Sequence, residues 1–96
     1  MNVGDYVRTI NGKIWVIKSQ KAISGHKKDI INYSPNVIDL IEIGDYVNGK
    51  YINEIDIHRK LIYSYERDDY YIFKERDIKS IVTKEQFESV EYRIGE

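Results

Sequence analysis

The side chains best suited to binding chemistry in this 96-residue chain fall into two groups, and the first of them is basic. Its members follow one another within eleven residues: Lys18, Lys21, His26, Lys27 and Lys28. Ammonium and imidazolium groups pair with phosphates and carboxylates, so this group predicts contact with an anionic ligand or partner. The surrounding range 1–28 carries a net charge of +5, against −6 for residues 29–96.

The second group is acidic and rich in tyrosine, and it lies in the second half of the chain. Its members are Asp56, Tyr63, Tyr65, Asp68 and Asp69. Tyrosine provides a large contact area at a low cost in conformational entropy, and a carboxylate array complements a basic partner. For both groups the alternative interpretation is an ordinary solvated surface, with most of the nine tyrosines serving as strand residues.

Residue types needed for catalysis are scarce. The chain has no cysteine, which excludes disulfides, a thiolate nucleophile and a thiolate metal site. Its two histidines, His26 and His58, are too few for a typical metal site, and no serine stands in a nucleophile-elbow context. We therefore predict no catalytic residue, no bound metal, no cofactor and no enzymatic activity. A sequence pI near 6.1 also argues against direct nucleic-acid binding.

A duplicated motif organises the elements that position these groups. The sequence Gly-Asp-Tyr-Val occurs at 4–7 and again at 44–47, and each copy is followed by Asn-Gly-Lys, at 11–13 and at 48–50. Asn-Gly is the strongest short-range signal for a two-residue hairpin turn. Each copy therefore predicts a strand, a tight turn and a second strand.

Other segments follow from hydrophobic periodicity and turn residues. The first half is predicted to contain a strand over 13–18, a loop over 19–28 and a strand over 29–33. A helical turn or irregular connector is expected over 36–43. Alternating residues over 51–58 and 61–66 predict strands of a meander, and Thr83 with Gln86 forms a capping box that begins a short helix over 83–90. A last strand is expected over 91–94.

The fold class that these elements predict is mainly β, a small α+β protein. The expected architecture is a strongly bent antiparallel sheet or an SH3-like partial barrel, with one short helix near the C-terminus. Residues 1–96 are predicted to form a single domain, in which a basic hairpin and loop over 1–33 precede an acidic, tyrosine-rich meander over 34–96. Without a signal-peptide pattern or an apolar span, the expected location is the cytoplasm.

Three stretches of the sequence, 4–9, 34–49 and 77–90, resemble a group of small proteins from viruses of bacteria. These proteins are encoded in phages and prophages of Gram-positive, Clostridium- or Bacillus-like bacteria. The resemblance brings no activity and no site residues with it. It implies a context, in which small non-catalytic proteins act by stoichiometric binding to a host component.

In that context, the resemblance implies a counter-defence inhibitor similar to anti-CRISPR proteins. Such an inhibitor would block a host immune protein through the acidic, tyrosine-rich face. One alternative is a sponge that sequesters an anionic signalling nucleotide with the basic group, at a homo-oligomer interface. A second alternative is a structural or accessory component of the virion.

Overall fold

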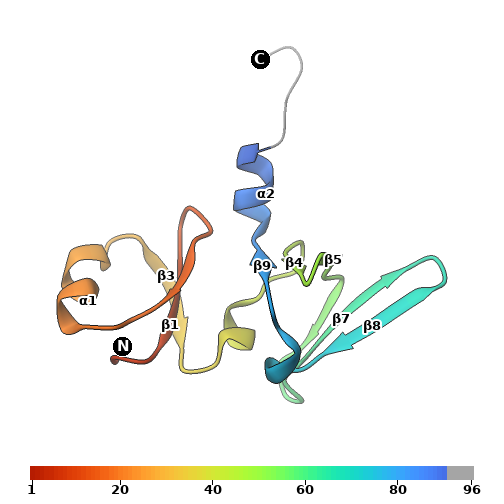
Figure 1. Cartoon of the computed structure of the whole chain (residues 1–96), viewed down its shortest axis with the longest axis horizontal. Coiled ribbons are helices and arrows are strands. Elements are labelled where there is room, and N and C mark those ends of the chain that lie inside the picture. Colours follow the sequence, from red (N-terminus) through yellow and green to blue (C-terminus); the bar gives the residue numbers. More distant parts are fainter. Residues whose placement is uncertain (91–96) are drawn as a thin grey trace, which may run out of the picture.

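The computed structural model describes the backbone of residues 1–90 and the side chains of residues 1–87. Figure 1 shows α1 at one end of the molecule, the β7–β8 hairpin at the other, and α2 projecting from between them. In chain order the elements are β1 (Tyr6–Thr9), β2 (Ile14–Val16), α1 (Gln20–His26), β3 (Ile30–Ser34), the 3₁₀ helix η1 (Val37–Leu40), β4 (Tyr46–Val47), β5 (Lys50–Tyr51), β6 (Glu54–Asp56), β7 (Leu61–Glu66), β8 (Asp69–Phe73), the 3₁₀ helix η2 (Glu75–Asp77), β9 (Ile81–Val82) and α2 (Lys84–Val90).

Within residues 1–90 the strands form three antiparallel sheets of three strands each, with the orders β2-β1-β3, β5-β4-β9 and β6-β7-β8. The prediction of a small, mainly β protein is confirmed. No hydrogen-bonded ladder among residues 1–90 joins one sheet to another, so closure into a barrel stays a prediction.

The duplicated motif builds the same three-stranded unit twice. Gly4 and Gly44 adopt φ values of +98° and +101°, a region open to glycine and costly for other residues. Gly4 N–H donates to the carbonyl of Ile17 at 2.8 Å, and Gly44 N–H donates to that of Ile52 at 3.0 Å. In each unit a third strand, β3 or β9, then pairs with the other edge of the motif strand.

What differs between the two units is the segment inserted before the third strand. The first unit carries α1 between β2 and β3, whereas the second carries the whole β6-β7-β8 sheet between β5 and β9. The two insertions lie at opposite ends of the molecule (Figure 1). The predicted basic group therefore lies mainly in and beside the α1 insertion, and the predicted acidic group lies in the β6-β7-β8 insertion.

The two Asn-Gly turns also differ. Asn48 and Gly49 both have positive φ, 53° and 79°, as the predicted two-residue turn requires. In the first unit only Gly12 does, and the connection spans three residues, with Thr9 N–H donating to the carbonyl of Lys13. The two-residue prediction is wrong there. The first copy has three residues, 8–10, between its Val and its Asn that the second copy lacks, and β1 is accordingly four residues long where β4 has two.

Two other predictions are corrected by hydrogen bonding. The loop expected over 19–28 contains α1, which Ser19 caps by accepting a hydrogen bond from Ala22 N–H at 3.3 Å. The single strand expected over 51–58 is split into β5 and β6. Ile52 N–H donates to Asp45 in the second unit, whereas Asn53 N–H donates to Tyr63 in the inserted sheet, so the chain changes sheets between them.

The helical turn expected within 36–43 is confirmed as η1, and the capping box is confirmed at the start of α2. Thr83 and Gln86 exchange hydrogen bonds of 3.2 and 3.3 Å between side chain and backbone N–H. The strand expected over 91–94 lies outside the described residues. Five buried side chains of the second half pack into one apolar cluster: Ile38, Ile41, Val47, Ile52 and Ile62.

A buried arginine joins the two units. The Arg8 side chain has 0% exposure, and it donates two hydrogen bonds to the carboxylate of Asp45, at 2.5 and 3.0 Å. It also donates to Glu85 at 2.7 Å and to the carbonyl of Leu40 at 3.0 Å. Burial opposes the charged form, but the hydrogen bonds and charge of Asp45 prevail, and the pKa of Arg8 is raised.

Candidate functional site

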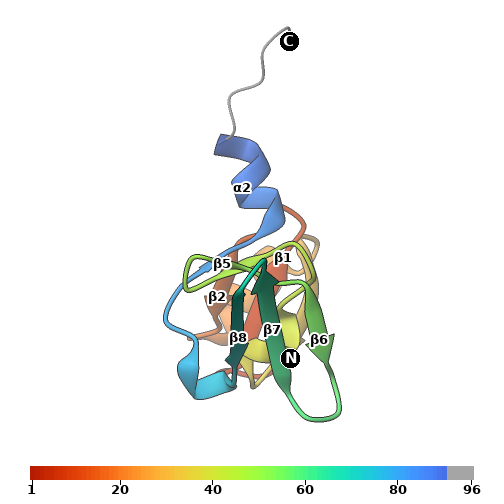
Figure 2. The same cartoon turned by 90° about the vertical axis from the view of Figure 1, so that its right-hand side faces the viewer.

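The outer face of sheet β6-β7-β8 gathers exposed aromatic side chains. The β7–β8 register pairs Tyr63 with Ile72 and Tyr65 with Tyr70, which places these four residues on one face. Ile62, which alternates with them, is fully buried on the opposite face. Three of the four remain accessible: Tyr65 is 43% exposed, Ile72 49% and Tyr70 60%. Figure 2 shows this sheet at the front of the molecule.

The tyrosine rings are ordered by contact with one another. The ring centroids of Tyr65 and Tyr70 lie 6.1 Å apart with an interplanar angle of 13°, and Tyr63 lies 6.2 Å from Tyr70. Cross-strand aromatic pairs of this kind stabilise a sheet and limit the rotamers available to each ring. A partner that binds these rings therefore loses little of their conformational entropy.

Carboxylates stand beside these rings. Glu54 pairs with Tyr63 and Asp56 pairs with Leu61 across the β6–β7 ladder, so all four share the outer face. We define the tyrosine face as Glu54, Asp56, Leu61, Tyr63, Tyr65, Tyr70 and Ile72. Of the predicted acidic group, Asp56, Tyr63 and Tyr65 lie on this face, while Asp68 and Asp69 are exposed where the hairpin turns from β7 to β8.

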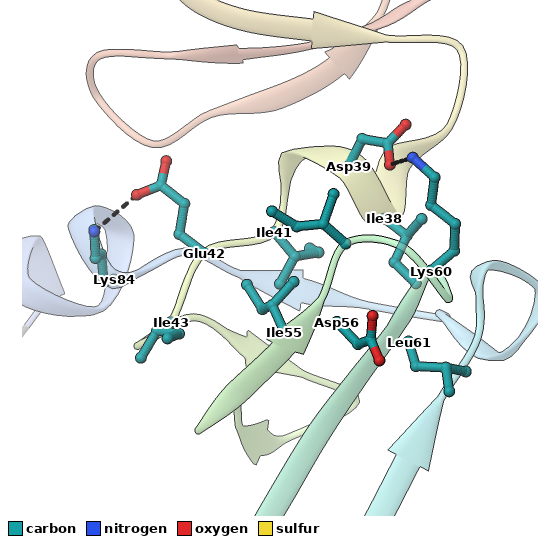
Figure 3. A pocket seen from close by; sticks show the side chains of 11 residues that line it. Ile38, Asp39, Ile41, Glu42, Ile43, Ile55, Asp56, Lys60, Leu61 and Lys84 are labelled. Carbon is teal, nitrogen blue, oxygen red and sulfur yellow. Dashed lines mark hydrogen bonds and ion pairs between the residues drawn. The ribbon is translucent and has the colours of Figure 1, made fainter.

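Next to the tyrosine face lies an apolar groove of about 650 Å³, and Asp56 and Leu61 belong to both. It runs between the connector that includes η1 and the edge strand β6 (Figure 3). Its apolar lining is aliphatic: Ile38, Ile41, Ile43, Ile55, Ile57 and Leu61. Ile43 and Ile57 are 55% and 73% exposed, so they extend the aliphatic surface beyond the groove.

The charged groups of the groove are paired with one another. Lys84 contacts Glu42 at 2.8 Å, and Lys60 contacts Asp39, so one ion pair lies on each side of the aliphatic lining in Figure 3. The hydrogen bond and charge of Glu42 raise the pKa of Lys84. Asp56 accepts a hydrogen bond from the backbone N–H of Arg59 at 3.0 Å. These pairings leave the centre of the groove apolar.

The Asp39 carboxylate makes stability depend on pH. Partial burial acts to raise its pKa, but hydrogen bonds from Lys60 and from the Ser34 hydroxyl, the latter 2.6 Å long, prevail and lower it. A lowered folded-state pKa stabilises the fold above the unfolded value of about 3.9, and this contribution is lost as pH falls through the folded value.

Asp39→Asn is therefore expected to cost up to about 1 kcal/mol at pH 7, the scale of a partly exposed ion pair. The difference from wild type should shrink as pH falls below 4, where wild-type Asp39 takes up a proton. Urea unfolding at several pH values measures this. A cost that stays constant down to pH 2 would contradict the assignment.

The predicted basic group is only partly brought together. Lys18 and His26 line a second cavity of about 530 Å³ beside β2, together with Lys13 and Trp15. Lys21, Lys27 and Lys28 are exposed and do not line that cavity. The five residues of the predicted basic group therefore do not all line one cavity, and the two that do share it with the indole ring of Trp15.

Sequence reasoning missed Tyr70, Ile72 and Lys13. The signal for the first two was the alternation in β8, which places residues 70 and 72 on one face once the hairpin register is known. The signal for Lys13 was weaker, because only the fold brings the end of the first turn close to Lys18 and α1.

Neither a metal centre nor a membrane span is found in the described part of the chain. No group of three or more His, Asp or Glu side chains there could hold a metal ion. None of the helices within residues 1–90 has the length and hydrophobicity that crossing a membrane requires. Comparisons of this chain with protein families, with curated proteins and with solved structures find no match.

Proposed function

We propose that this protein is a non-catalytic binding protein that attaches stoichiometrically to one partner protein through the tyrosine face and the adjoining groove. The observation that carries the proposal is the exposure of Tyr65, Tyr70 and Ile72 side by side on one sheet, next to the carboxylates of Glu54 and Asp56. The partner surface that complements this arrangement is basic, with apolar side chains at its centre.

Composition and continuity support an interface at this position. Tyrosine is enriched at the centres of protein interfaces, and contiguous exposed apolar surface on a small protein marks an interaction site. Leu61 and Asp56 connect the tyrosine face to the aliphatic groove, so the two form one surface. Carboxylates at its border, including Asp68 and Asp69, would steer a basic partner and increase the association rate.

The resemblance to small phage and prophage proteins supports a host protein as the partner. In that proposal the protein acts in the cytoplasm of the infected cell as a counter-defence inhibitor, with the tyrosine face covering a basic surface that an immune effector uses to hold nucleic acid. A virion component is the alternative, in which the same face binds another phage protein. The two differ in the partner that is recovered, not in the surface used.

The test is affinity capture followed by measurement of the dissociation constant for the partner recovered. Tyr65→Ala combined with Tyr70→Ala should weaken binding at least 30-fold, because truncating interface tyrosines typically costs 2 kcal/mol or more at a hot spot. The matched control is Tyr33→Ala, which removes a tyrosine of 50% exposure from the first unit. It should bind as wild type does.

Charge reversal provides a second, independent measurement. Asp68→Lys combined with Asp69→Lys should reduce the association rate constant and weaken its dependence on salt, with little change in the dissociation rate. Both sites are exposed, so the melting temperature should stay within a few degrees of wild type. If the tyrosine double variant and Tyr33→Ala bind equally well, the tyrosine face is not the interface.

A further inference from the structure

The cavity beside β2 lies in the first unit, away from the tyrosine face. Its lining comes from the first hairpin and from α1, which lie together at one end of the molecule (Figure 1). Its volume of about 530 Å³ falls within the 300–1,000 Å³ typical of small-molecule sites. The proposed partner-binding function makes no use of it.

Two rings form one wall of this cavity. The indole of Trp15, from β2, and the imidazole of His26, from α1, meet edge to face with centroids 5.4 Å apart and an interplanar angle of 68°. Trp15 is half-buried, and both residues line the cavity. A half-buried indole in a cavity presents a flat apolar surface against which a planar ligand can stack, a contact worth about 1–3 kcal/mol for a nucleic-acid base.

Six polar residues line the cavity, and among them the two lysines outnumber the one carboxylate: Thr9, Asn11, Lys13, Lys18, His26 and Asp29. Lys13, Lys18 and His26 face the cavity, opposed by one carboxylate, that of Asp29. None of the ion pairs found among residues 1–87 involves Lys13 or Lys18. An anion placed there gains charge-assisted hydrogen bonds without breaking an existing ion pair.

We propose that this cavity binds a small ligand of the nucleotide class, with the base against Trp15 and the phosphate held by Lys13 and Lys18. The cavity combines an aromatic wall with two lysines, and a nucleotide carries the two groups that these contact, a planar ring and a phosphate. His26 supplies a further donor to the phosphate. This second site is independent of the tyrosine face.

The experiment uses the chain's only tryptophan as its reporter. The full-length protein is titrated with AMP, GMP and cyclic di-AMP, and Trp15 fluorescence is recorded. At least one nucleotide should give a saturable change, with a dissociation constant at least tenfold below those of adenosine and inorganic phosphate. The proposal is overturned if no nucleotide changes the signal, or if phosphate or adenosine alone binds as well as the nucleotide.

Three variants locate the site. Lys18→Glu should weaken nucleotide binding at least tenfold, and Asp29→Asn should tighten it, because a carboxylate that lines the cavity is removed. The matched control is Lys21→Glu, an equal charge change at an exposed position outside the cavity. Equal weakening by Lys18→Glu and Lys21→Glu would show that nucleotide affinity depends only on the net charge of the protein, and it would contradict the assignment of the site to this cavity.

Discussion

Replacing Arg8 by methionine is expected to lower the free energy of unfolding by about 3–5 kcal/mol, the cost of breaking a buried ion pair by removing one partner. The Arg8 side chain is fully buried and donates to Asp45, whose side chain has 0% exposure, and to Glu85. Methionine fills much of the same volume but leaves Asp45 and Glu85 without their cation, and it also removes the contact of 3.2 Å between Arg8 Nε and Glu42. Urea unfolding followed by circular dichroism measures the loss.

Two further variants separate the arginine's role from a general effect of charge. Lys84→Met removes the exposed ion pair with Glu42 and should cost less than about 1 kcal/mol. The double variant Arg8→Met with Asp45→Asn should lose less stability than the two single variants summed, because each single change leaves one member of the buried pair without its partner. A cost for Arg8→Met no larger than that for Lys84→Met would show that Arg8 does not hold the two units together.

Of the two aspartates in the duplicated Gly-Asp-Tyr-Val motif, Asp45 pairs with Arg8 and Asp5 does not. Asp5 and Asp45 play the same local role, accepting backbone hydrogen bonds from Asn2 at 3.0 Å and from Glu42 at 2.8 Å. Asp45 in addition accepts from Arg8 and from the N–H of Lys84, which begins α2. The second motif is therefore both a strand entry and the point where three parts of the chain meet.

Local signals in the sequence predicted those features that depend on a few neighbouring residues. The capping box at Thr83 and the Asn48-Gly49 turn both form as expected, since each is decided by hydrogen bonds or φ values within four residues. The burial of Arg8 had no local signal, because Asp45 and Glu85 lie 37 and 77 residues away in the chain.

The candidate sites divide in the same way. Alternation along β7 was enough to place Tyr63 and Tyr65 together, but Tyr70 needed the hairpin register. In the basic group, Lys18 precedes α1 and His26 ends it, and both line the cavity, whereas Lys21 in the first turn of the same helix does not. The direction of each side chain in residues 20–26 is set by α1, and the loop predicted for this segment gave no basis for deciding which side chains face the cavity.

Gly12→Ala is expected to cost about 2–4 kcal/mol, of which about 1 kcal/mol comes from placing a side chain at φ +83° and the rest from overpacking. Gly12 is buried in the turn of the first hairpin, and its carbonyl accepts a hydrogen bond from the Thr83 hydroxyl at 2.7 Å. A Cβ added there would lie 2.7 Å from the Cβ of Glu85 and closer still to Thr83 Oγ1.

The control is Gly49→Ala in the equivalent turn of the second unit, where φ is +79° and nothing lies within 4 Å of an added Cβ. It should cost only the conformational term of about 1 kcal/mol, and equal losses for the two variants would contradict the packing argument. The methyl group that Gly12→Ala adds crowds Glu85, which also receives a hydrogen bond from Arg8. The double variant should therefore lose less free energy of unfolding than Gly12→Ala and Arg8→Met lose when their separate losses are added. Either change alone already disturbs the Glu85 carboxylate.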